Sequence, residues 1–156
     1  MLFSGCTQQS APVHFSSNSS TGIGVTMAVR EPIRIDSRRT TKAVFEDHLA
    51  LAAKGVVEED LLRNYHEDCV ILINSCEYRG HAGARKLADQ LEREMPEAKF
   101  EYTTKLVSGR FAFLEWSGTS QTNSVRDGAD SFVIENSKIV AQTIHYTLIP
   151  NREMMS

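Results

Sequence analysis

The carboxylate of Asp130 begins a run of mostly apolar residues that ends at Ile134, where a charged side chain is unusual. Residues 127–148 have the pattern of two strands joined by a polar turn. Because side chains alternate along a strand, Asp130 and Phe132 share one face of the first strand, and Gln142 and Tyr146 share one face of the second. Burial raises the pKa of a carboxyl group and suits it to general acid or base catalysis. Gln142 and Tyr146 would then orient a ligand, although core tyrosines with a satisfied hydroxyl are equally common.

Four further residues have the side chains of metal ligands but not their spacing. His66, Cys69, Cys76 and His81 do not follow a standard zinc pattern. We therefore predict no metal site and no cofactor. Trp116, on a later strand, is either a wall of a cavity or part of the sheet packing, because its strand parity is ambiguous.

Composition places the chain among single-domain proteins of ordinary polarity. It has 156 residues, a net charge of −3 and three cysteines. The negative charge, without a basic stripe, argues against nucleic-acid binding. An odd number of cysteines without framework spacing favours a reducing, cytoplasmic compartment. Since no apolar run approaches the roughly 20 residues that span a bilayer, we expect no membrane segment.

The elements that must position these residues follow from periodicity and turn residues. We expect a loosely attached arm over residues 1–38, a domain over 39–150 and a tail over 151–156. In the first helix His48 shares one face with Phe45, Leu49 and Ala52. The predicted helices cover residues 40–54, 58–65 and 81–95; the predicted strands cover 69–74, 99–107 and 111–119, followed after a polar loop (120–126) by the final hairpin. This order indicates an α+β fold, with a curved antiparallel sheet wrapped round the helices and a ligand cavity between them.

Three segments of the sequence resemble those of a known superfamily. They are residues 62–70, residues 78–84, and residues 127–134 together with 138–140. On these the chain resembles the nuclear transport factor 2-like superfamily, and within it the SnoaL-like branch. The resemblance implies a cone-shaped, cystatin-like α+β barrel with a small-molecule site. It does not imply one reaction, because the superfamily includes both enzymes and binding domains.

The resemblance also assigns expectations to single positions. His48 lies where ketosteroid isomerases of this fold place an oxyanion-binding tyrosine, and Asp130 matches their protonated, hydrogen-bond-donating aspartate. Their general base corresponds to Ile73, whose aliphatic side chain cannot accept a proton. Ordinary steroid isomerisation is therefore not expected.

These expectations leave two functions open. In the first, His48 and Asp130 form a catalytic acid/base pair in a cofactor-independent lyase or isomerase that acts on a small apolar or aromatic organic substrate. Its substrate contacts would be Tyr146, Gln142, Trp116, Ile73 and Phe132. In the second, the same pair is a structural hydrogen bond and the protein is a non-catalytic ligand-binding or dimerisation module. Either protein would be a homodimer formed through the outer face of its sheet.

Overall fold

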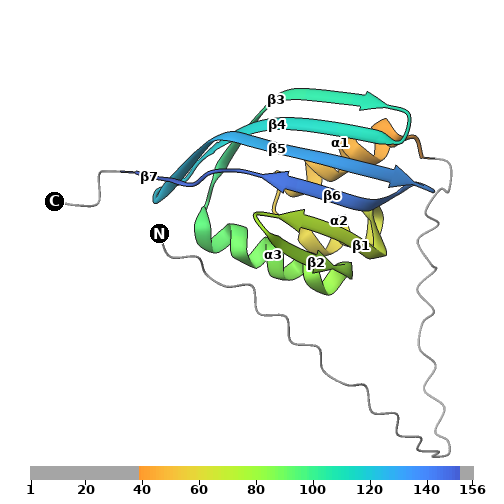
Figure 1. The fold of residues 1–156 in the computed structure, drawn as a ribbon, viewed down its shortest axis with the longest axis horizontal. Coiled ribbons are helices and arrows are strands. Elements are labelled where there is room, and N and C mark those ends of the chain that lie inside the picture. The colour runs from red at the N-terminus through yellow and green to blue at the C-terminus, as the bar shows by residue number, and fades with distance from the viewer. Residues whose placement is uncertain (1–38, 152–156) are drawn as a thin grey trace, which may run out of the picture. The chain divides into compact units, whose positions relative to one another are not determined.

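Three helices lie against one seven-stranded sheet in residues 39–151, the part of the chain that the computed structural model describes. Figure 1 shows α3 beneath β1 and β2, and α1 behind β4 and β5. None of the helices in this part is long and apolar enough to cross a membrane. The predicted arm over residues 1–38 and the predicted tail beyond residue 151 lie outside the described residues. The elements are α1 (Thr41–Ala52), α2 (Val57–Asn64), β1 (Tyr65–Ile73), β2 (Cys76–Arg79), α3 (Gly80–Glu94), β3 (Lys99–Ser108), β4 (Phe111–Thr119), β5 (Asn123–Glu135), β6 (Lys138–His145) and β7 (Ile149–Pro150).

The sheet is mixed and open. Its strand order is β2-β1-β6-β5-β4-β3, with β7 paired to β5. Neighbours that follow one another along the chain are joined by short turns, which make them antiparallel. The first and last long strands, β1 and β6, are far apart in sequence, so no turn fixes their direction, and they pair in parallel. The predicted α+β class and curved sheet are confirmed. A fully antiparallel sheet was the wrong prediction, and the sheet does not close into a barrel.

Local boundaries differ from the expected ones where polar residues form regular structure. The predicted loop over residues 120–126 is shorter, because β5 already begins at Asn123. The predicted second helix ends at Asn64, and Tyr65 begins β1 instead. The short strand β2, which was not predicted, turns back along β1 through Asn74 and Ser75, both with positive φ.

The core lies between the helices and the inner face of the sheet. Alternation along β5 and β6 buries the expected face, including Asp130 and Gln142, while His145 is exposed. On α1 the expected inner residue Ala52 is exposed. On α2, Leu62 is 57% exposed. The largest side chains that are almost fully buried are Phe45, Phe132, Ile71, Ile139, Val44 and Val125.

Candidate functional site

Asp130 lies on the inner face of β5 and accepts a hydrogen bond at each carboxyl oxygen. Trp116 Nε1 donates to Oδ1 at 2.9 Å, and Gln142 Nε2 donates to Oδ2 at 2.9 Å. The two donors come from β4 and β6, the strands on either side, so the sheet itself holds the carboxyl group in place. The residue is only 8% exposed.

The pKa of Asp130 reflects a balance between burial and these contacts. Burial raises it, while the hydrogen bonds from Trp116 and Gln142 and the charge of His48 act in the opposite direction. The net effect is a raised pKa, as expected for a carboxyl group suited to acid/base chemistry.

The indole of Trp116 can reach Asp130 because the residue opposite it is a glycine. Trp116 pairs with Gly128 across β4 and β5. A Cβ at position 128 would lie 2.2 Å from Trp116 Cδ2, which is an impossible contact. The strand parity that the sequence left ambiguous is therefore inward. The indole packs edge-on to Phe100 at 5.5 Å and against Tyr146 at 5.7 Å between ring centroids.

Gln142 extends the polar cluster from Asp130 to Tyr65 at the start of β1. The Tyr65 hydroxyl donates to Gln142 Oε1 at 2.6 Å. Burial raises the pKa of Tyr65 well above its ordinary value, and the negative charges of Asp60 and Asp130 add to this. Tyr65 therefore stays protonated and acts as a hydrogen-bond donor in this cluster.

His48, on α1, binds a carboxylate other than the expected one. Its Nδ1 lies 2.8 Å from Oδ2 of Asp60, on α2, and both side chains are buried. Asn64 Nδ2 donates to the other oxygen, Oδ1 of Asp60, at 2.8 Å. The His48 ring packs edge-on to Tyr65 and Phe132, with centroids 5.4 Å and 5.3 Å away.

The structure therefore separates the predicted pair into two neighbouring clusters. His48 belongs with Asp60 and Asn64, whereas Asp130 belongs with Trp116, Gln142 and Tyr65. A direct hydrogen bond between His48 and Asp130 was the wrong prediction for this conformation. The two remain close enough for a positive charge on His48 to oppose the rise in the pKa of Asp130. Their catalytic role stays a prediction.

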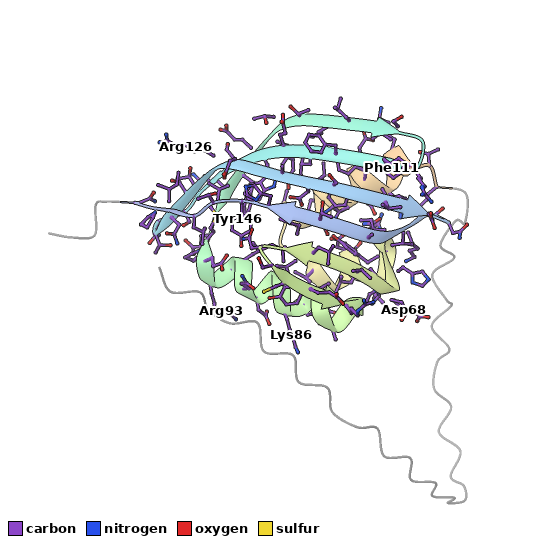
Figure 2. The ribbon with its side chains drawn as sticks, in the orientation of Figure 1. Asp68, Lys86, Arg93, Phe111, Arg126 and Tyr146 are labelled. Carbon is purple, nitrogen blue, oxygen red and sulfur yellow. The ribbon has the colours of Figure 1, made fainter. Side chains whose placement is uncertain are left out.

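The other predicted contact residues lie around these clusters. Ile73 and Phe132 are 3% and 1% exposed. Figure 2 shows Tyr146 near the C-terminal end of α3, where its hydroxyl donates to the Glu94 carboxylate. Burial, followed by that hydrogen bond, raises the pKa of Tyr146 far above its ordinary value.

Three residues of the site were missed in the sequence: Asp60, Asn64 and Tyr65. Asp60 and Asn64 are four residues apart, so they share one face of α2, and that face is buried. Apolar periodicity does not single out such polar residues. The spacing of an acid and an amide at i, i+4 beside Leu61 was the available signal.

A hollow lies on the outer face of the sheet, the face that points away from the helices. The expected cavity was instead between the helices and the sheet. The hollow has a volume of about 370 Å³. Leu106, Phe113, Ser131 and Thr143 follow one another across β3, β4, β5 and β6, and so lie on one face. The expected site residues that border it, Phe132 and Gln142, are otherwise part of the inner face. The complete lining is Leu106, Ser108, Phe111, Ala112, Phe113, Ser131, Phe132, Val133, Ala141, Gln142 and Thr143.

The two histidines near β1, His66 and His81, contact backbone groups. His81 Nε2 contacts the Tyr65 carbonyl at 3.2 Å, and His66 Nδ1 accepts from the Asp68 amide at 3.1 Å. Residues 39–151 hold no group of three or more His, Cys, Asp or Glu side chains arranged to bind a metal ion.

Comparison with known sequences now identifies the fold family. The profile of the SnoaL-like domain matches residues 43–142, which includes both polar clusters. The chain belongs to the SnoaL-like domain family. No curated protein matches the sequence of this SnoaL-like domain protein.

Solved structures show the same fold at low sequence identity. A provisionally named ketosteroid isomerase from Kribbella flavida has a TM-score of 0.60 and 17% identity, over 74% of this chain and 87% of that one. A nuclear transport factor 2-like protein of unknown function from Mesorhizobium loti has a TM-score of 0.59 and 18% identity, over 69% and 90%. A provisionally named polyketide cyclase from Sinorhizobium meliloti has a TM-score of 0.56 and 13% identity, over 68% and 99%. At these identities they show that the SnoaL-like chain has the nuclear transport factor 2-like fold.

Proposed function

We propose that this SnoaL-like protein binds a small apolar or aromatic organic molecule and transforms it, without a cofactor, as a lyase or isomerase. The observation that supports this best is the buried carboxyl group of Asp130, held by Trp116 and Gln142 within an aromatic surround. Perturbed ionisable groups in such surroundings are typical of catalytic sites. The names of the Kribbella and Sinorhizobium proteins agree with chemistry on small organic molecules.

The proposed chemistry divides the work between two groups. Asp130, with its raised pKa, would donate a hydrogen bond to a developing oxyanion once a ligand displaces one of its present partners. His48 would move the proton, since Ile73 stands where the resemblance places a base. The odd number of cysteines without framework spacing agrees with a cytoplasmic location for this reaction.

Replacing Asp130 by asparagine tests this proposal. Ligand-observed NMR with small phenols and cyclic ketones should show binding to the original protein. In Asp130→Asn, whose amide is a less acidic donor than a protonated carboxyl group, affinity for the bound compounds should fall about tenfold. Asp127→Asn, which changes an exposed carboxylate on the same strand, should leave binding unchanged. Equal binding by the original protein and Asp130→Asn would contradict the proposal.

The second candidate is a non-catalytic dimerisation module, supported by the outer face of the sheet. Leu106 and Phe111 are 60% and 52% exposed there, and both line the hollow. Figure 2 shows Phe111 near the turn between β3 and β4. Exposed apolar surface of this kind favours burial against a second copy of the chain, for which about 800 Å² per partner is typical.

Sedimentation equilibrium tests the homodimer. The original protein should sediment as a dimer at micromolar concentration, and Leu106→Gln/Phe111→Gln should dissociate at least tenfold more readily, because both substitutions place an amide in an apolar contact. Leu62→Gln, at an equally exposed leucine on α2, should remain dimeric. If the original protein sediments as a monomer, the proposed dimer through the outer face of the sheet is contradicted.

A further inference from the structure

His48 presents two nitrogen atoms in unlike surroundings. Nδ1 is bound to Asp60 at 2.8 Å. Nε2 binds no side chain or backbone group within residues 39–151. The His48 side chain as a whole is 10% exposed, so the ring is not fully enclosed.

The surroundings of Asp60 fix which nitrogen carries the hydrogen. Oδ1 of Asp60 accepts from Asn64 Nδ2, so Oδ2 is the oxygen that faces His48. Asp60 lies in the first turn of α2, where the helix dipole favours a negative charge. A carboxylate can only accept hydrogen bonds, so Nδ1 of His48 must donate. In neutral His48 the lone pair is then on Nε2.

Two aromatic rings pack against His48 and help to hold its ring in this orientation. Tyr65 and Phe132 pack edge-on to it, at interplanar angles of 81° and 61°. Both oxygens of Asp130 are meanwhile occupied by Trp116 and Gln142. Of the two groups in the proposed reaction, only His48 has a reactive atom without a partner in residues 39–151.

We infer that Asp60 is the positioning residue that makes Nε2 of His48 the proton-transferring atom, and that the substrate is a molecule with a weakly acidic O–H, or a C–H next to a carbonyl. This inference rests on the proposed function. As the O–H or C–H bond breaks, its electron pair stays on the substrate as an oxyanion or enolate, and the proton forms a bond to Nε2. The imidazolium charge is balanced by Asp60. The proton then returns to another substrate atom in an isomerisation, or to the leaving group in an elimination.

The tautomer of His48 provides a direct test in the full chain. Long-range ¹H–¹⁵N NMR distinguishes the two tautomers, and the loss of signals in His48→Gln assigns them. Neutral His48 should carry its hydrogen on Nδ1. In Asp60→Asn, whose amide can donate to the ring, Nε2–H should become the main form. Asp47→Asn, one residue from His48 but bound to Arg39 and Arg63, should leave the Nδ1–H form unchanged. An Nε2–H form in the original protein, or an unchanged tautomer in Asp60→Asn, would overturn the inference.

Binding and ionisation of 4-nitrophenol, measured separately, distinguish a failure of this inference from a failure of the proposed function. Below the pH at which the free phenol ionises, the bound phenol should show phenolate absorbance in the original protein and in Asp47→Asn. Asp60→Asn and His48→Gln should bind the phenol but lose at least nine-tenths of that absorbance. Binding without ionisation in the original protein would overturn the role of Nε2 alone. Absence of binding in every variant would overturn the proposed function and the inference together.

Discussion

Replacing Phe132 by alanine is expected to lower the free energy of unfolding by about 4 kcal/mol, because the core cannot refill the space of a buried aromatic ring. Phe132 is 1% exposed. Its ring lies 5.3 Å from that of Phe45 and 5.3 Å from that of His48, so it joins β5 to both an apolar and a polar residue of α1. Urea unfolding followed by circular dichroism measures the change.

Leu62→Ala is the matched control for this substitution. Leu62 is 57% exposed on α2, and its truncation should change the free energy of unfolding by less than about 0.5 kcal/mol. A loss below about 1 kcal/mol in Phe132→Ala would mean that α1 does not pack on β5 as described.

Gly128→Ala is expected to destabilise the domain by about 3 kcal/mol, because the added methyl group overlaps the Trp116 ring. Its Cβ would lie 2.2 Å from Cδ2 and 2.3 Å from Cε2 of the indole. The ring must move, and the hydrogen bond to Asp130 is then lost. Trp116 is the only tryptophan of the chain. Its fluorescence emission should therefore shift to longer wavelength as the indole meets water.

Gly55→Ala is the control for Gly128→Ala, because it adds the same methyl group where no side chain is in contact with it. A Cβ there meets nothing within 4 Å, but Gly55 has a φ of +67°, which costs a non-glycine residue about 1 kcal/mol. That variant should keep the original emission spectrum. An unshifted spectrum in Gly128→Ala would contradict the contact between the indole and Gly128.

The fold was predictable to the extent that local pattern determines it. Alternating burial on β5 and β6 follows directly from the sequence, and the inward positions of Asp130, Gln142 and Tyr146 are confirmed. The turn between these strands also forms where expected, although Asn136 and Ser137 take the positive φ values that usually favour glycine. The parallel pairing of β1 with β6 has no local signal, because no turn connects the two strands.

The candidate site was less predictable, because its partners depend on how helices pack. The family resemblance placed His48 and Asp130 on the same interior and so predicted that they would meet. The side chain that reaches His48 is instead Asp60, only 12 residues away, on the neighbouring helix. Apolar periodicity cannot identify such a residue, since a buried carboxylate looks like a surface residue until its partners are known.

The position of β6 has a consequence for synthesis on the ribosome. This strand lies between β1 and β5, so it alone joins the β2–β1 pair to the β5–β4–β3 group. It is also the last long strand of residues 39–151 to leave the ribosome. No nascent chain that ends before β6 can unite the two parts of the sheet, and contacts of such large sequence separation form slowly. Until β6 is made, the edges of β1 and β5 that pair with it stay unpaired. Chaperones that bind exposed strands could then bind either edge.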